Sequence, residues 1–406
     1  MTVTTAEKTI ARTQGSPHAE SYYRPELDVL RFGAFLLVFL FHVLPDAQDP
    51  RIDHSLGHFS FLFYAAVGAC RFGLTLFFTL SAFLICELLM RERSVAGSVG
   101  VKRFYIRRIL RIWPLYYFAL LLWFVWWSMS GVPQGEAARI GWFAIFLGSW
   151  YETIHLTPFT PLSPLWSISI EEQFYLFVPW VMKYAKTRLI YLFCFVTILS
   201  SNIVLFFAGR NTFAAEHSWF QSLVQFECFA AGILLSLSLR GRVPRWGLGR
   251  RAITLLGCSI AWMFASLLLV RSSDVHISAH PRALFLIVAY ALMTSGSVLL
   301  LISVLGMKAS LLPSWAIYLG RISFGLYVYH GFALRCMMHI NPQSLHLIAI
   351  HPYALRALVT SFVTIGLPFL ITFAMAYLSY RYLESPILRL KKRYEVIKTQ
   401  PVLTTT

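Results

Sequence analysis

Two ionisable side chains stand in the first apolar stretch of the chain, at about residues 27–44. Arg31 precedes His42 by eleven residues, about 16 Å or three turns along a helix, so both lie on roughly the same face. Ionisable groups within such apolar segments are costly and are therefore candidates for function. A histidine here could accept a proton from a hydroxyl. The alternatives are a hydrogen-bonded structural histidine and an arginine that extends to the lipid headgroups.

Further ionisable groups are expected at a similar depth in other apolar stretches. Adjacent carboxylates, Glu171 and Glu172, lie within Trp166–Tyr175, and His330 lies in a later stretch. An imidazole beside a carboxylate can deprotonate a hydroxyl, because the carboxylate fixes the imidazole tautomer and stabilises the imidazolium. The tandem glutamates could instead interact with a helix dipole. Glu227 is another carboxylate, for which the alternative is a buried hydrogen-bonded pair.

A basic stretch leads into the third long apolar run. Arg107, Arg108 and Arg111 lie at helical spacing within residues 102–114, and guanidinium groups in this pattern suit phosphate groups. Topology determinants and contacts with anionic lipids explain the same cluster equally well. On its own, the cluster therefore does not separate a phosphate site from a lipid contact.

The amino-acid composition predicts which secondary-structure elements position these residues. The 406-residue chain is 57% hydrophobic and 13% charged, against about 45–50% and about 25% in soluble domains. Apolar runs of about twenty residues suit helices that cross a hydrocarbon core of about 30 Å. We therefore predict an all-α fold, a polytopic transmembrane helical bundle.

The charge distribution and the cysteine positions limit the partners, disulfides and metal sites that we expect. The 35 lysines and arginines against 18 acidic residues give a net charge of +17. Because the basic residues concentrate between apolar runs, they favour topology and membrane-lipid contacts, and no nucleic-acid partner is expected. The six cysteines lie in or beside apolar segments and lack the spacing of metal ligands. We expect neither disulfides nor a metal site.

Eleven apolar stretches set the expected topology. They lie at about 27–44, 59–90, 113–130, 141–150, 174–185, 189–208, 220–239, 252–270, 283–305, 315–337 and 353–379. If residues 141–150 crossed the membrane, the basic cluster at 183–188 would lie outside. If they are re-entrant or interfacial, every basic cluster lies on the cytoplasmic side. We therefore expect about ten spans plus one re-entrant segment, with both termini cytoplasmic.

This topology divides the chain into three parts. Residues 1–24 form a polar cytoplasmic tail, residues 25–386 a transmembrane domain, and residues 387–406 a basic and polar cytoplasmic tail. The first 24 residues contain no apolar signal-peptide core, so we expect the first span to act as its own insertion signal.

Six elements, in order from Arg24 to about Pro386, resemble the acyltransferase-3 family of integral membrane acyltransferases. They are R-x10-H at Arg31 and His42, L-F-F-x-L-S-x-F-L-I at Leu76–Ile85, R-R-x-x-R at Arg107–Arg111, W-S-x-S-x-E-E-Q-F-Y at Trp166–Tyr175, S-F-x-L-Y-x-x-H at Ser323–His330 and R-Y-x-E-x-P at Arg381–Pro386. A single one of these elements is weak evidence for membership of the family, whereas six in the same order are specific evidence. The chain departs from the family pattern at Val29, Thr75 and Ala82, where glycine, aspartate and glycine are common.

The resemblance implies an O-acetyltransferase-type enzyme, here without the extracytoplasmic domain that the family often carries. Such an enzyme moves an acyl group, typically acetyl, from acyl-CoA to a hydroxyl of a carbohydrate or related acceptor. Acyl-CoA would be a co-substrate, and no permanently bound cofactor is expected. A bacterial cytoplasmic (inner) membrane is the expected location.

The resemblance also suggests roles for individual residues. Arg107, Arg108 and Arg111, together with Arg31, would hold the phosphates of acyl-CoA at the cytoplasmic face. His42 would act as the general base, or less favourably as a transient acyl carrier. The carboxylates Glu171 and Glu172 would orient the histidine or bind the acceptor. The residues expected to line the acceptor site are Trp166, Ser169, Tyr175 and His330.

Two alternatives to this function remain open. The expected acceptor is a cell-surface polysaccharide or lipopolysaccharide, and the first alternative is a small secondary metabolite such as a macrolide. A proton-coupled exporter would also use intramembrane histidine and glutamate, but it would not require a phosphate site or acyl-CoA. The acyl chain length, the oligomeric state and the choice between Glu171 and Glu172 are not fixed by the sequence.

Overall fold

The computed structural model describes residues 22–45, 49–130, 135–155, 158–274, 276–338 and 358–397, and this part of the chain is helical without any strand. Its helices are α2 (Pro25–Val43), α3 (Pro50–Leu56), α4 (Ser60–Cys70), α5 (Gly73–Ala96), α6 (Val101–Ser130), α7 (Glu136–Ala144), α8 (Gly148–Ile154), α9 (Trp166–Tyr184), α10 (Thr187–Ala208), α11 (Thr212–His217), α12 (Ser222–Leu239), α13 (Leu248–Ser272), α14 (Ala279–Val304), α15 (Ser314–Arg321), α16 (Ser323–Met338), α18 (Leu367–Ser379) and α19 (Ser385–Lys391). Wider π-type turns at Phe362–Gly366 and Tyr380–Glu384 flank α18.

Seven helical segments among the described residues are long and apolar enough to cross a membrane. They are Ile52–Ala96, Val101–Met129, Thr187–Ala208, Ser222–Leu239, Leu248–Ser272, Ala279–Val304 and Leu358–Tyr394. These segments confirm the predicted all-α, multi-pass membrane bundle.

The count of ten spans stays a prediction. Helices α2 and α9 carry several charged side chains, and α16 has only 16 residues, so none of the three belongs to the set of seven. Part of the predicted N-terminal tail, residues 353–357 of the last apolar stretch and residues 398–406 of the predicted C-terminal tail lie outside the described residues. Within the described part, α19 continues the helical structure as far as Lys391.

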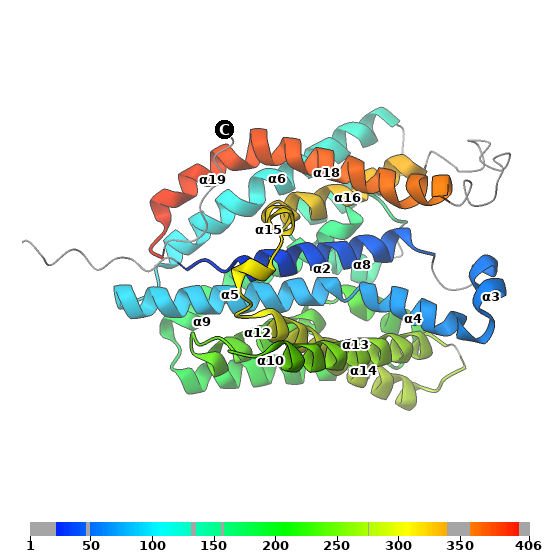
Figure 1. Cartoon of the computed structure of the whole chain (residues 1–406), viewed down its shortest axis with the longest axis horizontal. Helices are drawn as coiled ribbons and strands as arrows, with labels where there is room; N and C mark the ends of the chain where they lie inside the picture. Colours follow the sequence, from blue (N-terminus) through cyan, green and yellow to red (C-terminus); the bar gives the residue numbers. More distant parts are fainter. Residues whose placement is uncertain are drawn as a thin grey trace, which may run out of the picture.

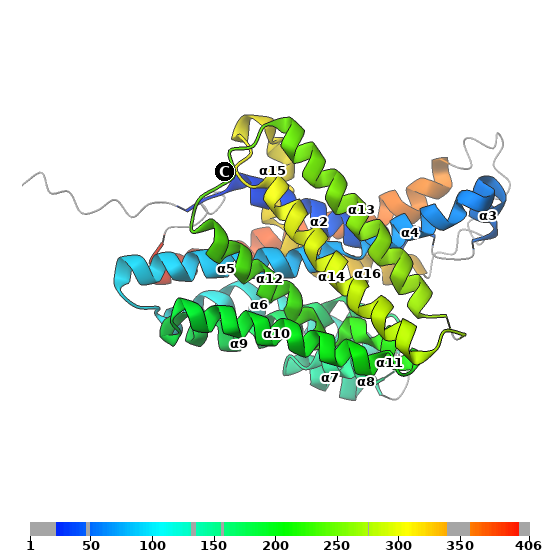
Figure 2. The same ribbon diagram turned by 90° about the horizontal axis from the view of Figure 1, so that it is seen from below.

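The helices run broadly along one axis (Figure 1). The beginning of α2, the end of α5, the beginning of α6 and α19 lie at the left end of the bundle, and α3 lies at the right end. Helix α5 is central, since it packs against α2, α9, α12 and α14. Seen from below, the paired helices α13 and α14 cross the bundle obliquely (Figure 2). Within the described residues, α2 therefore packs on α5, and α19 packs on α6.

The predicted apolar stretch at 59–90 is divided in the structure. Helix α4 ends at Cys70 and α5 begins at Gly73, so Arg71 and Phe72 form a turn between them. Both helices contact α2, but α4 also contacts α13, whereas α5 also contacts α12 and α14. The turn places an arginine side chain inside the bundle.

The predicted re-entrant stretch at 141–150 forms the short helices α7 and α8, of 9 and 7 residues. Neither approaches the about 20 residues that a membrane span requires. The chain reverses between them at Phe146, which adopts a left-handed φ of 58°. This geometry is compatible with the interfacial or re-entrant segment that the charge pattern predicts.

A buried ion cluster fixes these two helices. Arg139 of α7 is almost fully buried and pairs with Glu136 at 3.1 Å and with Glu152 of α8 at 2.5 Å. Its guanidinium also donates to the Ser163 hydroxyl at 2.9 Å. A buried arginine with this many acceptors joins α7, α8 and the entry to α9 into one unit.

Replacing Arg139 with methionine is expected to destabilise this unit by about 3–5 kcal/mol, because two buried carboxylates lose their counter-charge. The midpoint of unfolding in a denaturing detergent series measures the effect. Arg271→Met is the matched control, since Arg271 is exposed and pairs only with Asp274 in the described residues; we expect a change below about 1 kcal/mol. Equal midpoint shifts for the two variants would contradict the proposed clamp.

Candidate functional site

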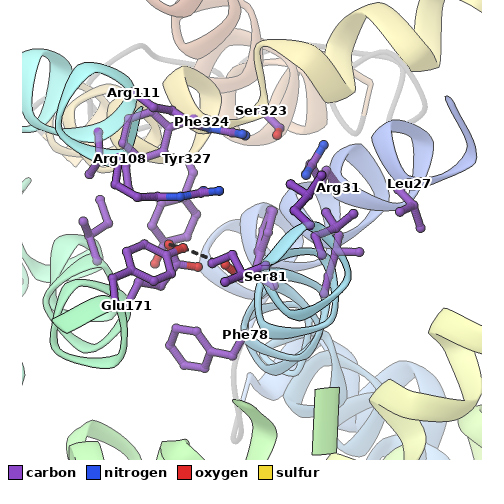
Figure 3. A pocket seen from close by; sticks show the side chains of 18 of the residues that line it. Leu27, Arg31, Phe78, Ser81, Arg108, Arg111, Glu171, Ser323, Phe324 and Tyr327 are labelled. Atoms are coloured by element: carbon purple, nitrogen blue, oxygen red, sulfur yellow. Dashed lines mark hydrogen bonds between the residues drawn. The ribbon is translucent and has the colours of Figure 1, made fainter. Parts of the chain in front are cut away.

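A cavity of about 170 Å³ opens between α2, α5, α6, α9, α16 and α19. Its polar lining includes two groups of residues. Figure 3 shows Arg108 and Arg111 on one side of the space and Arg31 on the other, with Glu171 beneath Arg108. The first group, here called the arginine end, consists of Arg24, Arg31, Arg108, Arg111 and Lys391. The second, here called the inner end, consists of Ser81, Ser167, Glu171, Tyr175 and Tyr327.

Two arginines of the arginine end, Arg108 and Arg111, lack a carboxylate partner among the described residues, whereas Arg24 and Lys391 pair with Glu26 and Glu395. Arg108 has a buried Nε without an acceptor, and its guanidinium stacks over the Tyr175 ring at 5.4 Å. Arg111 has no hydrogen bond or ion pair with any part of the chain that the structure describes. Arg31, which approaches from the opposite side in Figure 3, pairs with Asp28 at 2.7 Å. An anion with several oxygens would complete this end of the cavity.

The third arginine of the R-R-x-x-R element has a different environment. Arg107 donates to Glu92 at 2.8 Å and to the Tyr394 carbonyl at 2.9 Å, and it does not line the cavity. Its two acceptors belong to α5 and to the turn after α19. Arg107 therefore connects the C-terminal segment to the bundle behind the cavity wall.

The two adjacent glutamates of α9 also have different environments. Glu171 lines the inner end and accepts a hydrogen bond from the Tyr175 hydroxyl at 3.1 Å, and Tyr175 is joined to the Ser81 hydroxyl at 2.6 Å (Figure 3). Glu172 points elsewhere and accepts from the Trp113 indole at 3.1 Å. Successive helical residues are about 100° apart, so only one of the pair can face the cavity.

The two histidines lie together, just beyond the inner end. The ring centroids of His42 and His330 are 5.2 Å apart. In each ring Nδ1 contacts a backbone carbonyl, at Val38 for His42 (2.8 Å) and at Tyr327 for His330 (2.5 Å). Because a carbonyl only accepts, Nδ1 carries the proton in the neutral ring and Nε2 keeps its lone pair. Each Nε2 is thus able to accept a proton.

Tyr327 connects the cavity to the histidine pair. Its ring centroid lies 5.4 Å from that of His330, and its hydroxyl donates to the Pro164 carbonyl at 2.7 Å. The Ser167 hydroxyl is 2.7 Å from the Tyr327 hydroxyl. Within the described residues, no hydrogen bond or ion pair joins either histidine to Glu171. The structure therefore brings His42 and His330 together and separates them from the carboxylate by Tyr327.

Two further residues of the predicted acceptor site do not line the cavity. Trp166 packs against Phe78, Trp219 and Phe220, and Ser169 is fully buried in α9. Both residues precede Tyr175, which does line the cavity. Their positions fit a supporting role behind the lining.

Several site residues were not identified from the sequence although signals for them existed. Ser81 and Tyr327 lie inside the elements Leu76–Ile85 and Ser323–His330, and Lys391 belongs to the last basic cluster. Arg71 is an isolated ionisable residue in the apolar stretch at 59–90. Because an ionisable side chain in such a stretch is costly, Arg71 is also a candidate for function. Only tertiary packing shows that the first three share one cavity.

Comparisons with known proteins extend over most of the chain. A family profile described as an acyltransferase domain, acyltransferase 3, matches residues 24–376. A Staphylococcus aureus (strain COL) protein, provisionally named an O-acetyltransferase, is 26% identical over 340 residues, which cover 77% of this chain and 52% of that protein. The peptidoglycan O-acetyltransferase OatA of Listeria monocytogenes is 29% identical over 169 residues, which cover 39% of this chain and 24% of that protein. The chain thus spans about half the length of the Staphylococcus relative. No solved structure matches the chain significantly.

Proposed function

Because the chain belongs to the acyltransferase-3 family, we propose that it is an integral membrane O-acyltransferase that moves an acetyl group from acetyl-CoA to a hydroxyl of a carbohydrate. The names of the relatives support both the acetyl group and the carbohydrate, since they include O-acetyltransferases and a peptidoglycan O-acetyltransferase. The observation that carries the proposal is a cavity in which Arg108 and Arg111 lack carboxylate partners among the described residues, with a histidine pair beyond its inner end.

The arginine end is the proposed site for the phosphates of acyl-CoA. Arg108 and Arg111 support this role because both line the cavity without a carboxylate partner in the described part of the chain. Arg31 and Lys391 add positive charge on other sides of the same space. This end would face the cytoplasm, where acyl-CoA is made, and the extended pantetheine arm would reach toward Glu171 and Tyr327. Arg107 would support this end from behind through Glu92.

The histidine pair is the proposed site of acyl transfer. The acceptor hydroxyl would give its proton to Nε2 of His42 while its oxygen forms a bond to the thioester carbonyl carbon. The carbon–sulfur bond then breaks, and the coenzyme A thiolate takes the proton from the imidazolium. His330 would stabilise the charged ring through its own free Nε2. Arg31 and His42 are about 16 Å apart along α2, so donor phosphates and acceptor would approach from different depths.

Glu171 is the carboxylate that we propose binds the acceptor. Replacing it with glutamine is expected to lower kcat/KM for transfer by about 10–150-fold, the effect of losing one hydrogen bond to a charged group. Glu172→Gln is the matched control, because it removes the same charge one residue away while the amide oxygen keeps the bond from Trp113. Its transfer rate should change by less than about threefold. A larger effect at Glu172 than at Glu171 would contradict this assignment.

The proposed function is tested with the purified full chain in nanodiscs. Binding of radiolabelled acetyl-CoA and the slow release of coenzyme A, followed by chromatography, report on the donor half of the reaction. We expect saturable binding and turnover that increases when hydroxylated sugars are added. If neither short-chain nor long-chain acyl-CoA binds, the donor site is wrong, and a proton-coupled exporter becomes the better explanation.

A further inference from the structure

Arg71 is an arginine inside the bundle that the acyl-CoA site does not use. It lies in the turn between α4 and α5, and Leu74, three residues later, lines the cavity. Its guanidinium carbon is 3.9 Å from the centre of the Trp219 ring and 5.8 Å from that of Phe41. Stacking on a ring face covers the plane of a guanidinium and leaves its N–H groups pointing outward at the edge.

The Arg71 guanidinium lacks an anionic partner. Its Nε is buried without an acceptor, and the Arg71 side chain forms no hydrogen bond and no ion pair with the described residues. Two other buried arginines of the bundle have acceptors: Arg139 binds two carboxylates, and Arg282 donates to three backbone carbonyls. Arg91 and Arg321 also have a buried Nε without an acceptor, but each forms an ion pair with a carboxylate, which Arg71 does not.

Arg108 provides an internal comparison. It shares with Arg71 a guanidinium stacked on an aromatic ring and a buried Nε without an acceptor. Arg108 lines the cavity that the proposed function assigns to the phosphates of acyl-CoA. Arg91 and Arg321 show both features too but pair with Glu87 and Asp28, whereas no ion pair joins Arg71 or Arg108 to a carboxylate of the described residues. A stacked guanidinium without a carboxylate partner suits an anion that is not part of the protein.

The position of Arg71 relates this second site to the acceptor. The Phe41 ring against which Arg71 lies is adjacent to His42, with ring centroids 5.2 Å apart. Arg71 therefore lies one aromatic ring away from the proposed general base and does not belong to the arginine end. An anion bound at Arg71 would hold a neighbouring hydroxyl close to His42.

We propose that Arg71 binds an anionic group, a carboxylate or a phosphate, of the molecule that carries the acceptor hydroxyl. This inference rests on the proposed function and refines it, because it restricts the acceptor to acidic carbohydrates. The stacked guanidinium presents two N–H groups at its edge, which match the two oxygens of such an anion. Neutral sugars would lack this contact and bind more weakly.

Paired sugars test the proposal in nanodiscs made only of zwitterionic lipid. Methyl glucuronide differs from methyl glucoside by one carboxylate. Glucose 1-phosphate is the third ligand and tests whether a phosphate is bound in place of a carboxylate. We expect at least one of the two acidic sugars to bind wild type about tenfold or more tightly than methyl glucoside, as one charge-assisted bidentate contact allows. This preference should vanish in Arg71→Gln and be reduced in Arg71→Lys, which retains the charge without the planar fork.

Control arms separate the outcomes. Arg271→Gln removes an exposed arginine and should retain the preference. A preference that persists in Arg71→Gln, or that is absent from wild type, would overturn the proposal. Loss of the preference when phosphatidylglycerol is added would assign Arg71 to a lipid headgroup and also overturn it. Acetyl-CoA binding is measured separately in the same samples, so failure of the donor site alone would count against the proposed function and not against Arg71.

Discussion

Replacing His42 with alanine is expected to lower acetyl transfer by about 10²–10⁴-fold, the range that a positioned general base contributes. The structure gives the reason, because Nδ1 of His42 is committed to the Val38 carbonyl and Nε2 is left to accept a proton. Binding of acetyl-CoA should be unchanged, since His42 does not line the cavity. Single-turnover transfer of radiolabelled acetyl, measured beside equilibrium binding, separates the two effects.

Two variants sharpen the interpretation of this result. His330→Ala should reduce the transfer rate less than His42→Ala if His330 only stabilises the charged ring. Acid quenching of the wild-type reaction before acceptor is added distinguishes a base from an acyl carrier, because a covalent acyl-histidine would retain label on the protein. A His42→Ala enzyme that transfers acetyl at the wild-type rate would remove this residue from the reaction.

Replacing Arg108 and Arg111 together with alanine is expected to weaken acetyl-CoA binding by about 10²–10⁴-fold, since each charge-assisted contact contributes about 1.5–3 kcal/mol. Both residues line the cavity, and neither is held by a carboxylate within the described residues. Equilibrium binding in nanodiscs measures the loss. Acetyl-pantetheine, which lacks the nucleotide phosphates, should bind wild type and the double variant equally.

Arg107→Ala is the matched control for the arginine pair. Arg107 belongs to the same sequence element but pairs with Glu92 and with the Tyr394 carbonyl. Its replacement should reduce thermal stability, because Glu92 is left buried without its partner, and should change donor affinity less than the double variant does. If Arg107→Ala alone abolished binding and the pair did not, the arginine end would be assigned wrongly.

The membrane bundle was predictable because it follows from average properties of long segments. Apolar runs of spanning length determine the helices, and short basic segments between them predict the topology. The division of residues 59–90 was not predictable, because the turn at Arg71 and Phe72 contains neither glycine nor proline at those two positions. That turn lies where the neighbours of the chain change from α13 for α4 to α12 and α14 for α5.

The sequence identified the elements that form the site, but it did not show which of their side chains line the cavity. Arg107 and Arg111 are four residues apart and Arg108 and Arg111 three apart, and both spacings share a helix face. Packing selects Arg108 and Arg111 for the cavity, and it selects Glu171 over Glu172 in the same way. Lys391 could not be placed, because no local pattern shows that α19 returns to α6.

The return of α19 to the beginning of α6 has a consequence for biosynthesis. The cavity is lined by Tyr22 and Arg24 at one end of the described chain and by Lys391 near the other. A growing chain therefore inserts its helices one after another without a complete donor pocket. If the cavity binds the acyl donor as proposed, the complete site forms only after residue 391 has left the ribosome and docked. The nascent protein would pass through the translocon without hydrolysing the cell's acetyl donor.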